Sequence, residues 1–136
     1  MASSIDVLVD AIGWQGPERV DVVERRHLTD YRRAIGTEEP ADEEVPPTLC
    51  ACFLSEPPPM PAADAYGVGW INGGDRFEYV GPRLVLGDAV TSRTRFTDVS
   101  EKRGRSGSLA ILTFETEFVR GDGVPVVRHI GTRIRR

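Results

Sequence analysis

The sequence predicts an α+β fold in which an antiparallel sheet packs against a helix. The chain has 136 residues, a length typical of one domain, and we treat residues 1–136 as a single domain. One segment near the N-terminus has apolar residues at helical spacing. From Arg76 onward, apolar and polar residues instead alternate in segments separated by turn sequences. A helix followed by consecutive strands is the order typical of α+β proteins.

The first elements are a short strand and a helix. Residues 18–24 alternate apolar and polar side chains, which indicates a strand. In residues 25–35 the apolar side chains, Leu28 and Tyr31 among them, fall on one helical face. Gly36 follows at the position where helices commonly end on a glycine. We therefore predict a helix that ends at Gly36.

The middle of the chain is rich in proline. Residues 37–48 are acidic and contain three prolines, so regular structure is not expected there. The apolar run at 49–54 fits a buried helix or a strand, and periodicity does not distinguish the two. The sequence Pro-Pro-Pro-Met-Pro at 57–61 is typical of a rigid surface loop. A polyproline ligand for a partner protein is the alternative.

The C-terminal half predicts four strands of one antiparallel sheet. Their expected ranges are 76–80, 89–99, 108–119 and 124–134. The sequence Gly-Asp-Gly at 121–123 indicates a hairpin turn, and 101–108 is expected to form a loop. The side chains of the third strand expected to pack on a helix are Ala110, Leu112, Phe114 and Phe118. The residues expected on the apolar face of the last strand are Val124, Val126, Ile130 and Ile134, with His129 on the opposite face.

Composition and charge argue against several functional classes. The net charge of −4 is unlike the basic face of nucleic-acid-binding proteins. We see no apolar run of the roughly 20 residues that a membrane helix needs, and no signal peptide, so a cytoplasmic location is expected. Cys50 and Cys52 are separated by one residue, which is poor spacing for a disulfide. His27 and His129 have no partner evident in the sequence, so both are interpreted as structural, and no metal or cofactor is expected.

Four motifs in a fixed order resemble the MaoC-like dehydratases. They read VERRHLTDYRRAIGTEEP, VPPT, INGGDRFEYVGPRLVLGD and EKRGRSGSLAILTFETEF. The resemblance covers about residues 18–136 and is closest to the N-terminal-type (FAS1-like) domain. Domains of that type also form one subunit of heterodimeric 3-hydroxyacyl-thioester dehydratases.

This resemblance implies a single hot-dog fold, a curved antiparallel sheet wrapped around a helix. It implies that two such domains pair into one continuous sheet, as a homodimer or as a heterodimer with a second MaoC-like chain. It also implies acyl-CoA or acyl-carrier-protein thioesters as ligands, and the addition or removal of water across the α,β bond of a 3-hydroxyacyl group.

The catalytic segment departs from the family pattern. Active members carry G-D-x-N-P-x-H after the first helix, and this chain reads G-T-E-E-P-A-D from Gly36. Thr37 stands at the position of the catalytic Asp, Glu39 at that of the Asn, and Asp42 at that of the catalytic His. A threonine hydroxyl cannot act as a general base near neutral pH. The resemblance therefore implies a supporting, non-catalytic subunit, while related chemistry by Glu38, Glu39 and Asp42, or a merely solvated acidic loop, are the alternatives.

Six residues are candidates for substrate binding: Gly36, Glu39, Pro47, Thr48, Asn72 and Gly73. Pro47 and Thr48 match the family's P-P-T sequence, which precedes the acyl pocket, although Thr48 also suits a helix N-cap. Asn72 is placed to hydrogen-bond a thioester carbonyl, and Gly73 lets the backbone approach a ligand closely. A simple turn before a strand is the alternative for both.

Basic side chains near two turns are candidates for a polyanionic ligand. They are Lys102, Arg103, Arg105, Arg133, Arg135 and Arg136. Such cations suit the phosphates of CoA or the acidic face of a carrier protein, and solvated surface charge is the alternative.

Three functions remain open for the chain. The first is a subunit of a thioester dehydratase or hydratase, and the second is a non-catalytic hot-dog module that binds an acyl thioester or a protein. The third is a hot-dog thioesterase, in which Asp42 or Glu39 would have to act on the thioester carbonyl.

Overall fold

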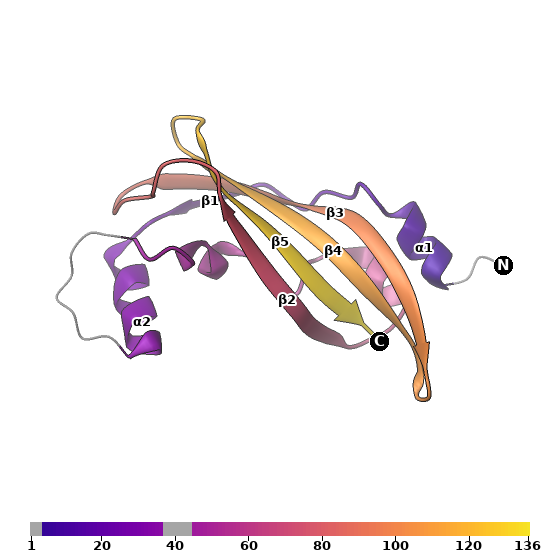
Figure 1. The fold of residues 1–136 in the computed structure, drawn as a ribbon. Helices are drawn as coiled ribbons and strands as arrows, with labels where there is room; N and C mark the ends of the chain where they lie inside the picture. The colour runs from indigo at the N-terminus through magenta and orange to yellow at the C-terminus, as the bar shows by residue number, and fades with distance from the viewer. Residues whose placement is uncertain (1–3, 37–44) are drawn as a thin grey trace.

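The computed structural model describes residues 4–36 and 45–136 and contains a five-stranded antiparallel sheet in the order β1-β3-β4-β5-β2 (Figure 1). The strands are β1 (Arg19–Val22), β2 (Trp70–Tyr79), β3 (Ala89–Gly104), β4 (Gly107–Arg120) and β5 (Pro125–Arg135). The predicted antiparallel sheet is thus confirmed. The edges of the sheet are β1 and β2, of which β2 is much the longer.

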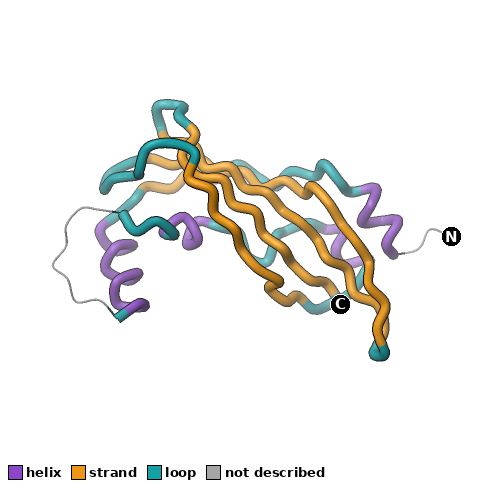
Figure 2. Tube along the Cα trace, in the orientation of Figure 1, coloured by secondary structure: helices purple, strands orange, loops and turns teal. Residues whose placement is uncertain are grey.

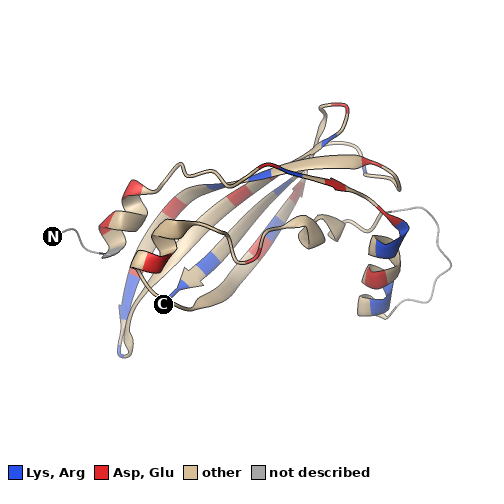
Figure 3. Ribbon diagram, turned by 180° about the vertical axis from the view of Figure 1, so that it is seen from behind, with Lys and Arg blue, Asp and Glu red and all other residues tan. Residues whose placement is uncertain are grey.

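The long strands curve, and the helical segments lie on one face of the sheet (Figures 2 and 3). These segments are α1 (Ser4–Asp10), α2 (Arg25–Ile35), and the 3₁₀ helices η1 (Leu49–Phe53) and η2 (Pro61–Ala65). No helix in the described parts of the chain is long and apolar enough to cross a membrane.

Helix α2 has the bounds predicted from its periodicity. At its N-terminus the Glu24 side chain and the His27 imidazole form a reciprocal capping box, in which His27 Nδ1 accepts the Glu24 N–H at 3.0 Å. At its C-terminus Gly36 adopts the left-handed conformation, with φ of 77°. Leu28 is fully buried under the sheet. The structural interpretation of His27 is therefore confirmed.

The proline-rich middle forms two short 3₁₀ helices, η1 and η2. The apolar run at 49–54, which periodicity left open, forms η1, and its Leu49, Cys50 and Phe53 are buried. Prolines 57–59 have no N–H to continue a helix, and the chain becomes helical again only at Pro61. Residues 54–60, between η1 and η2, contain these prolines, and we call them the proline segment. The concave face of the sheet is therefore covered by η1, the proline segment and η2 in turn.

Two apolar clusters fill the space between the sheet and these segments. The first joins α2 and η1 to the sheet and contains Leu28, Leu49, Phe53, Val90, Phe118 and Val126. The second joins α1 and η2 to the sheet and contains Leu8, Met60, Ala63, Phe96, Leu112 and Phe114. The β4 side chains expected to pack on a helix thus do so, divided between the two clusters.

The predicted face of β5 is wrong beyond Val126. In the register of β4 and β5, Phe118 pairs with Val127 but Val119 pairs with Pro125, so Val126 is an extra residue in a β-bulge. Because side chains alternate with a period of two, one extra residue exchanges the two faces. The residues buried beyond the bulge are Val127, His129, Gly131, Arg133 and Arg135, whereas Ile130 and Ile134 are only partly buried.

The predicted loop at 101–108 is also wrong. Strand β3 extends to Gly104 and β4 begins at Gly107, so a tight hairpin joins them. Lys102 pairs with Leu109 and Arg103 pairs with Ser108 in the ladder. The ladder hydrogen bonds outweigh the loop-like composition of this charged, glycine-containing segment.

Candidate functional site

A pocket of about 500 Å³ opens between the proline segment and strand β2, and we call it the edge pocket. Its apolar walls are formed by Leu54, Pro57, Pro58, Trp70, Ile71 and Phe77. Its polar side chains are Glu56, Asn72, Asp75 and Arg133. Apolar walls with a few polar groups, at this volume, are typical of small-molecule sites.

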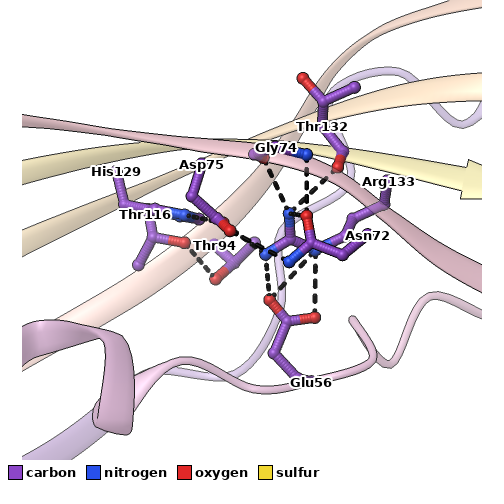
Figure 4. A network of polar contacts seen from close by, with 9 residues as sticks. All are labelled: Glu56, Asn72, Gly74, Asp75, Thr94, Thr116, His129, Thr132 and Arg133. Atoms are coloured by element: carbon purple, nitrogen blue, oxygen red, sulfur yellow. Dashed lines mark hydrogen bonds and ion pairs between the residues drawn. The ribbon is translucent and has the colours of Figure 1, made fainter. Parts of the chain in front are cut away.

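Arg133 is the centre of the polar network (Figure 4). Its buried guanidinium donates from Nε to both carboxylate oxygens of Glu56 at 3.2 Å, and from Nη2 to Glu56 and to Asp75 Oδ1, the latter at 2.7 Å. Nη1 donates to the Asn72 side chain at 3.2 Å and to the carbonyls of Gly74 and Thr132 at 3.1 and 3.0 Å. Arg133 thereby ties the proline segment to β2.

Asp75 joins this network to His129. His129 Nε2 lies 2.7 Å from Asp75 Oδ1, and the His129 side chain is only 3% exposed. Burial by itself would raise the pKa of Asp75, but hydrogen bonds from Asn72, Arg133 and His129, with the charge of Arg133, lower that pKa to about 2. Asp75 is therefore ionised near neutral pH.

A β-bulge in β2 places Asp75 in the pocket. The register shifts between Asn72 and Gly74, and Gly74 has φ of 142°, which favours glycine. The Asn72 side chain accepts the Gly74 N–H at 2.8 Å and donates to Asp75 Oδ2 at 3.0 Å. A Cβ on Gly73 would come within 3.0 Å of Thr132 Cγ2, so this glycine permits close approach of β5. Asn72 and Gly73 thus lie inside a bulged strand rather than in a turn before it.

Polar side chains continue from the pocket across the concave face. Thr94 Oγ1 and Thr116 Oγ1 are 2.7 Å apart, and Thr116 pairs with His129 in the β4–β5 ladder. Among the described residues, His129 Nδ1 has no hydrogen-bond partner. The row of Thr94, Thr116 and His129 runs across the three central strands β3, β4 and β5 (Figure 4).

The candidates from the sequence fall in several places. Gly36 ends α2, and Asn72 lines the edge pocket. Pro47 lines a second pocket, of about 280 Å³, bounded by residues 45–47 and 81–84 with Cys50, Tyr79, Val126 and Val127. The Thr48 hydroxyl bonds to the Tyr31 hydroxyl and makes no N-cap hydrogen bond. Thr37, Glu39 and Asp42 lie outside the described residues, as does Glu38.

The expectation that Arg133 and Arg135 meet a polyanion is wrong, because both are buried. Arg135 donates to the Ala63 carbonyl at 3.0 Å and to Asp64 at 2.9 Å, and its guanidinium lies 4.8 Å from the centre of the Trp70 ring.

Cys50 and Cys52 are free, and burial raises the pKa of the Cys50 thiol to about 12. The described residues contain no cluster of His, Cys, Asp and Glu suited to a metal ion.

Sequence reasoning missed Glu56, Asp75, His129 and Arg133 as one site. The signal present in the sequence is the period-two spacing of His129, Gly131 and Arg133. Unbroken alternation along the strand predicts His129 on the face opposite Val126 and Ile130, because the bulge at Val126 has no signature in the sequence.

Comparison with known proteins supports the fold and the family. Residues 10–129 match the family model described as FAS1-like, dehydratase domain region. The chain is similar to a chain of the ChsH1–ChsH2 complex from Mycobacterium tuberculosis, with a TM-score of 0.75, 15% identity, and coverage of 97% of this chain and 90% of that one. It is similar to a chain of the truncated HadBC (3R-hydroxyacyl-ACP dehydratase) complex from the same organism, with a TM-score of 0.71, 19% identity, and coverage of 92% and 97%.

A third similar structure is the MaoC-like dehydratase from Rhodospirillum rubrum, with a TM-score of 0.64, 20% identity, and coverage of 95% of this chain and 97% of that one. A search of curated proteins found no match. At these identities the structures show the fold, and the predicted hot-dog fold is confirmed.

Proposed function

Since the chain belongs to the FAS1-like dehydratase domain family, we propose that it is one subunit of a 3-hydroxyacyl-thioester dehydratase or enoyl-thioester hydratase. In this proposal the chain binds the acyl group and supports a second MaoC-like chain that carries the intact Asp and His. Two of the similar structures are complexes of two named proteins, and one of these is a 3R-hydroxyacyl-ACP dehydratase. That precedent supports a heterodimer.

The supporting role follows from acid–base chemistry. Hydration needs a group that takes a proton from water and a group that delivers a proton to the α carbon. In the alignment that the family resemblance implies, Thr37 and Asp42 stand at the positions of the family's Asp and His. The Asp–His pair that the described residues do contain is a poor substitute, because Asp75, with a pKa of about 2, is a weak base and His129 is buried behind it.

The edge pocket is the observation that favours ligand binding. It lies beside β2, which pairs only with β5 in the described sheet, so the outer edge of β2 is open to a partner strand. A sheet continued across this edge would place the pocket at the subunit interface. Asn72 in the edge pocket and Pro47 in the second pocket are the candidates best placed to contact an acyl group.

The test is hydration of crotonyl-CoA by the purified chain, alone and together with a neighbouring gene's MaoC-like product that carries G-D-x-N-P-x-H. We expect the chain alone to be at least ~100-fold slower than an intact member, the lower end of what one acid–base group contributes. Replacing Thr37→Asp and Asp42→His together should restore part of this activity. Full activity of the chain alone, abolished by Asp42→Ala, would show instead that Asp42 is the base.

A further inference from the structure

The polar groups of the edge pocket offer a ligand more free hydrogen-bond acceptors than free hydrogen-bond donors. We propose that this pocket discriminates between acyl groups by charge and hydrogen-bonding capacity: it rejects acyl groups that end in a carboxylate and accepts those that carry a hydrogen-bond donor. The inference rests on the proposed function, because it names the class of acyl group that the pocket would bind.

The donors of the pocket are already used. Arg133 is the one cationic side chain among the described residues that line the pocket, and every nitrogen of the guanidinium donates to Glu56, Asp75, Asn72 or a backbone carbonyl. The Asn72 amide donates one hydrogen to Asp75, which leaves one for a ligand. One amide hydrogen cannot satisfy the several lone-pair positions of a ligand carboxylate.

The acceptors, in contrast, remain accessible. The Asp75 and Glu56 side chains are 32% and 43% exposed, and both residues line the pocket. A carboxylate has about four lone-pair positions, and among the described residues the two Glu56 oxygens accept from Arg133 alone. A ligand hydroxyl can donate to either carboxylate without displacing an existing bond.

The net charge of the edge pocket also disfavours a ligand carboxylate. Two carboxylates and one guanidinium give the pocket a net charge of −1, from Glu56, Asp75 and Arg133. A ligand carboxylate would meet two like charges between apolar walls, with no unused cationic donor to compensate. An aliphatic chain can pack against the apolar walls, and a hydroxyl or ammonium group on that chain can donate a hydrogen bond to the carboxylates.

The experiment compares acyl-CoA thioesters of equal chain length on the full chain by calorimetric titration. The ligands are decanoyl-CoA, 10-hydroxydecanoyl-CoA, 3-hydroxydecanoyl-CoA and the mono-CoA thioester of decanedioic acid. We expect at least one hydroxylated ligand to bind more tightly than decanoyl-CoA, and the carboxylate ligand to bind at least ~10-fold more weakly than that hydroxylated ligand. The two hydroxyl positions show which part of the acyl group reaches the pocket. Equal or tighter binding of the carboxylate ligand would overturn the inference.

A second arm separates this inference from the proposed function. The probes are 1-octanol, octylamine and octanoate, observed by the fluorescence of Trp70 in a Trp14→Phe variant, which leaves Trp70 as the only tryptophan. If no thioester binds but octanol and octylamine bind more tightly than octanoate, the thioester function fails and the pocket chemistry stands. If octanoate binds as tightly as the other two, the pocket chemistry is wrong.

Two glutamates of the chain provide a matched pair of variants. Glu56→Gln keeps a carbonyl oxygen for Arg133 and removes one negative charge, so discrimination against the carboxylate ligand should shrink several-fold. Glu78→Gln removes the same charge from β2, where Glu78 pairs with Arg76 and Arg128 and does not line the pocket, so discrimination should be unchanged. Equal effects of the two variants would contradict a role for Glu56. If Glu56→Gln does not fold, the inference is tested by the unmodified chain alone, through the relative affinities of the hydroxylated and carboxylate ligands.

Discussion

Asp75 and His129 are diagonal neighbours on the concave face of the sheet, joined at 2.7 Å although 54 residues separate them in the chain. In the β2–β5 ladder Asp75 pairs with Gly131 and His129 pairs with Phe77. The diagonal contact requires that nothing project from Gly131 between the imidazole of His129 and the guanidinium of Arg133. A Cβ built on Gly131 would lie 2.8 Å from His129 Cε1 and 3.1 Å from Arg133 Nη1.

Gly131→Ala should therefore disturb the polar network. The added methyl must push His129 or Arg133 away from Asp75, and overpacking of this kind costs roughly 1–3 kcal/mol. Urea denaturation of the variant should show that loss in the free energy of unfolding. Gly104→Ala is the matched control, because a Cβ there meets only the Gly107 carbonyl oxygen, at 3.8 Å. Equal stability of the two variants would mean that the network tolerates the methyl group.

Arg133→Met should destabilise the fold by about 2 kcal/mol or more. It leaves Glu56 and Asp75 without their cationic partner and releases the proline segment from β2. Breaking a fully buried pair costs about 3–5 kcal/mol, and the partial exposure of both carboxylates reduces this cost. Arg76→Met is the control, since Arg76 is 75% exposed and its ion pair with Glu78 lies at the surface. The free energies of unfolding of both variants, from guanidinium titrations, provide the comparison.

The contribution of Asp75 to stability should depend on pH in the acid range. The folded-state pKa of about 2 lies below the ordinary value of 3.8, so the folded state binds this proton less readily than the unfolded chain. The contribution is therefore complete above about pH 4 and is lost as the pH falls through about 2. The melting temperatures of the unmodified chain and of Asp75→Asn should converge across that interval. A difference that stays constant between pH 5 and pH 2 would show that Asp75 is not held ionised by its neighbours.

The outer edge of β2 should be the surface where two hot-dog domains meet. It is the longer of the two open edges, and it carries the exposed apolar side chains of Ile71 and Tyr79, 38% and 52% exposed. The double variant Ile71→Lys/Tyr79→Lys should sediment as a monomer at about 50 µM, where the unmodified chain, alone or with its partner, should sediment as a dimer. Val20→Lys on β1, where Val20 is 66% exposed, should leave the dimer intact. Dissociation by Val20→Lys alone would place the interface at β1.

Local periodicity was enough to predict much of the fold. The range 25–35 matches α2 because its apolar face and its C-terminal glycine are encoded within one contiguous segment. The four predicted strands correspond to β2, β3, β4 and β5, because alternation and hairpin turns are also local. The run at 49–54 stayed ambiguous because its six apolar residues fit several conformations, and packing under the sheet selected a 3₁₀ helix.

The candidate site depended on features that are not local. Asp75 and the buried His129 and Arg133 share one face because bulges at residues 72–74 and at Val126 shift the register of two strands. Glu56 reaches Arg133 across 77 residues of sequence because the prolines carry its segment over the concave face. The sequence by itself determined the order, type and approximate bounds of the elements, since these follow from the conformational preferences of neighbouring residues. Only the tertiary structure decided which side chains of β2 and β5 face the pocket, because strand register is set by pairing between distant segments, and a single extra residue exchanges the two faces of a strand.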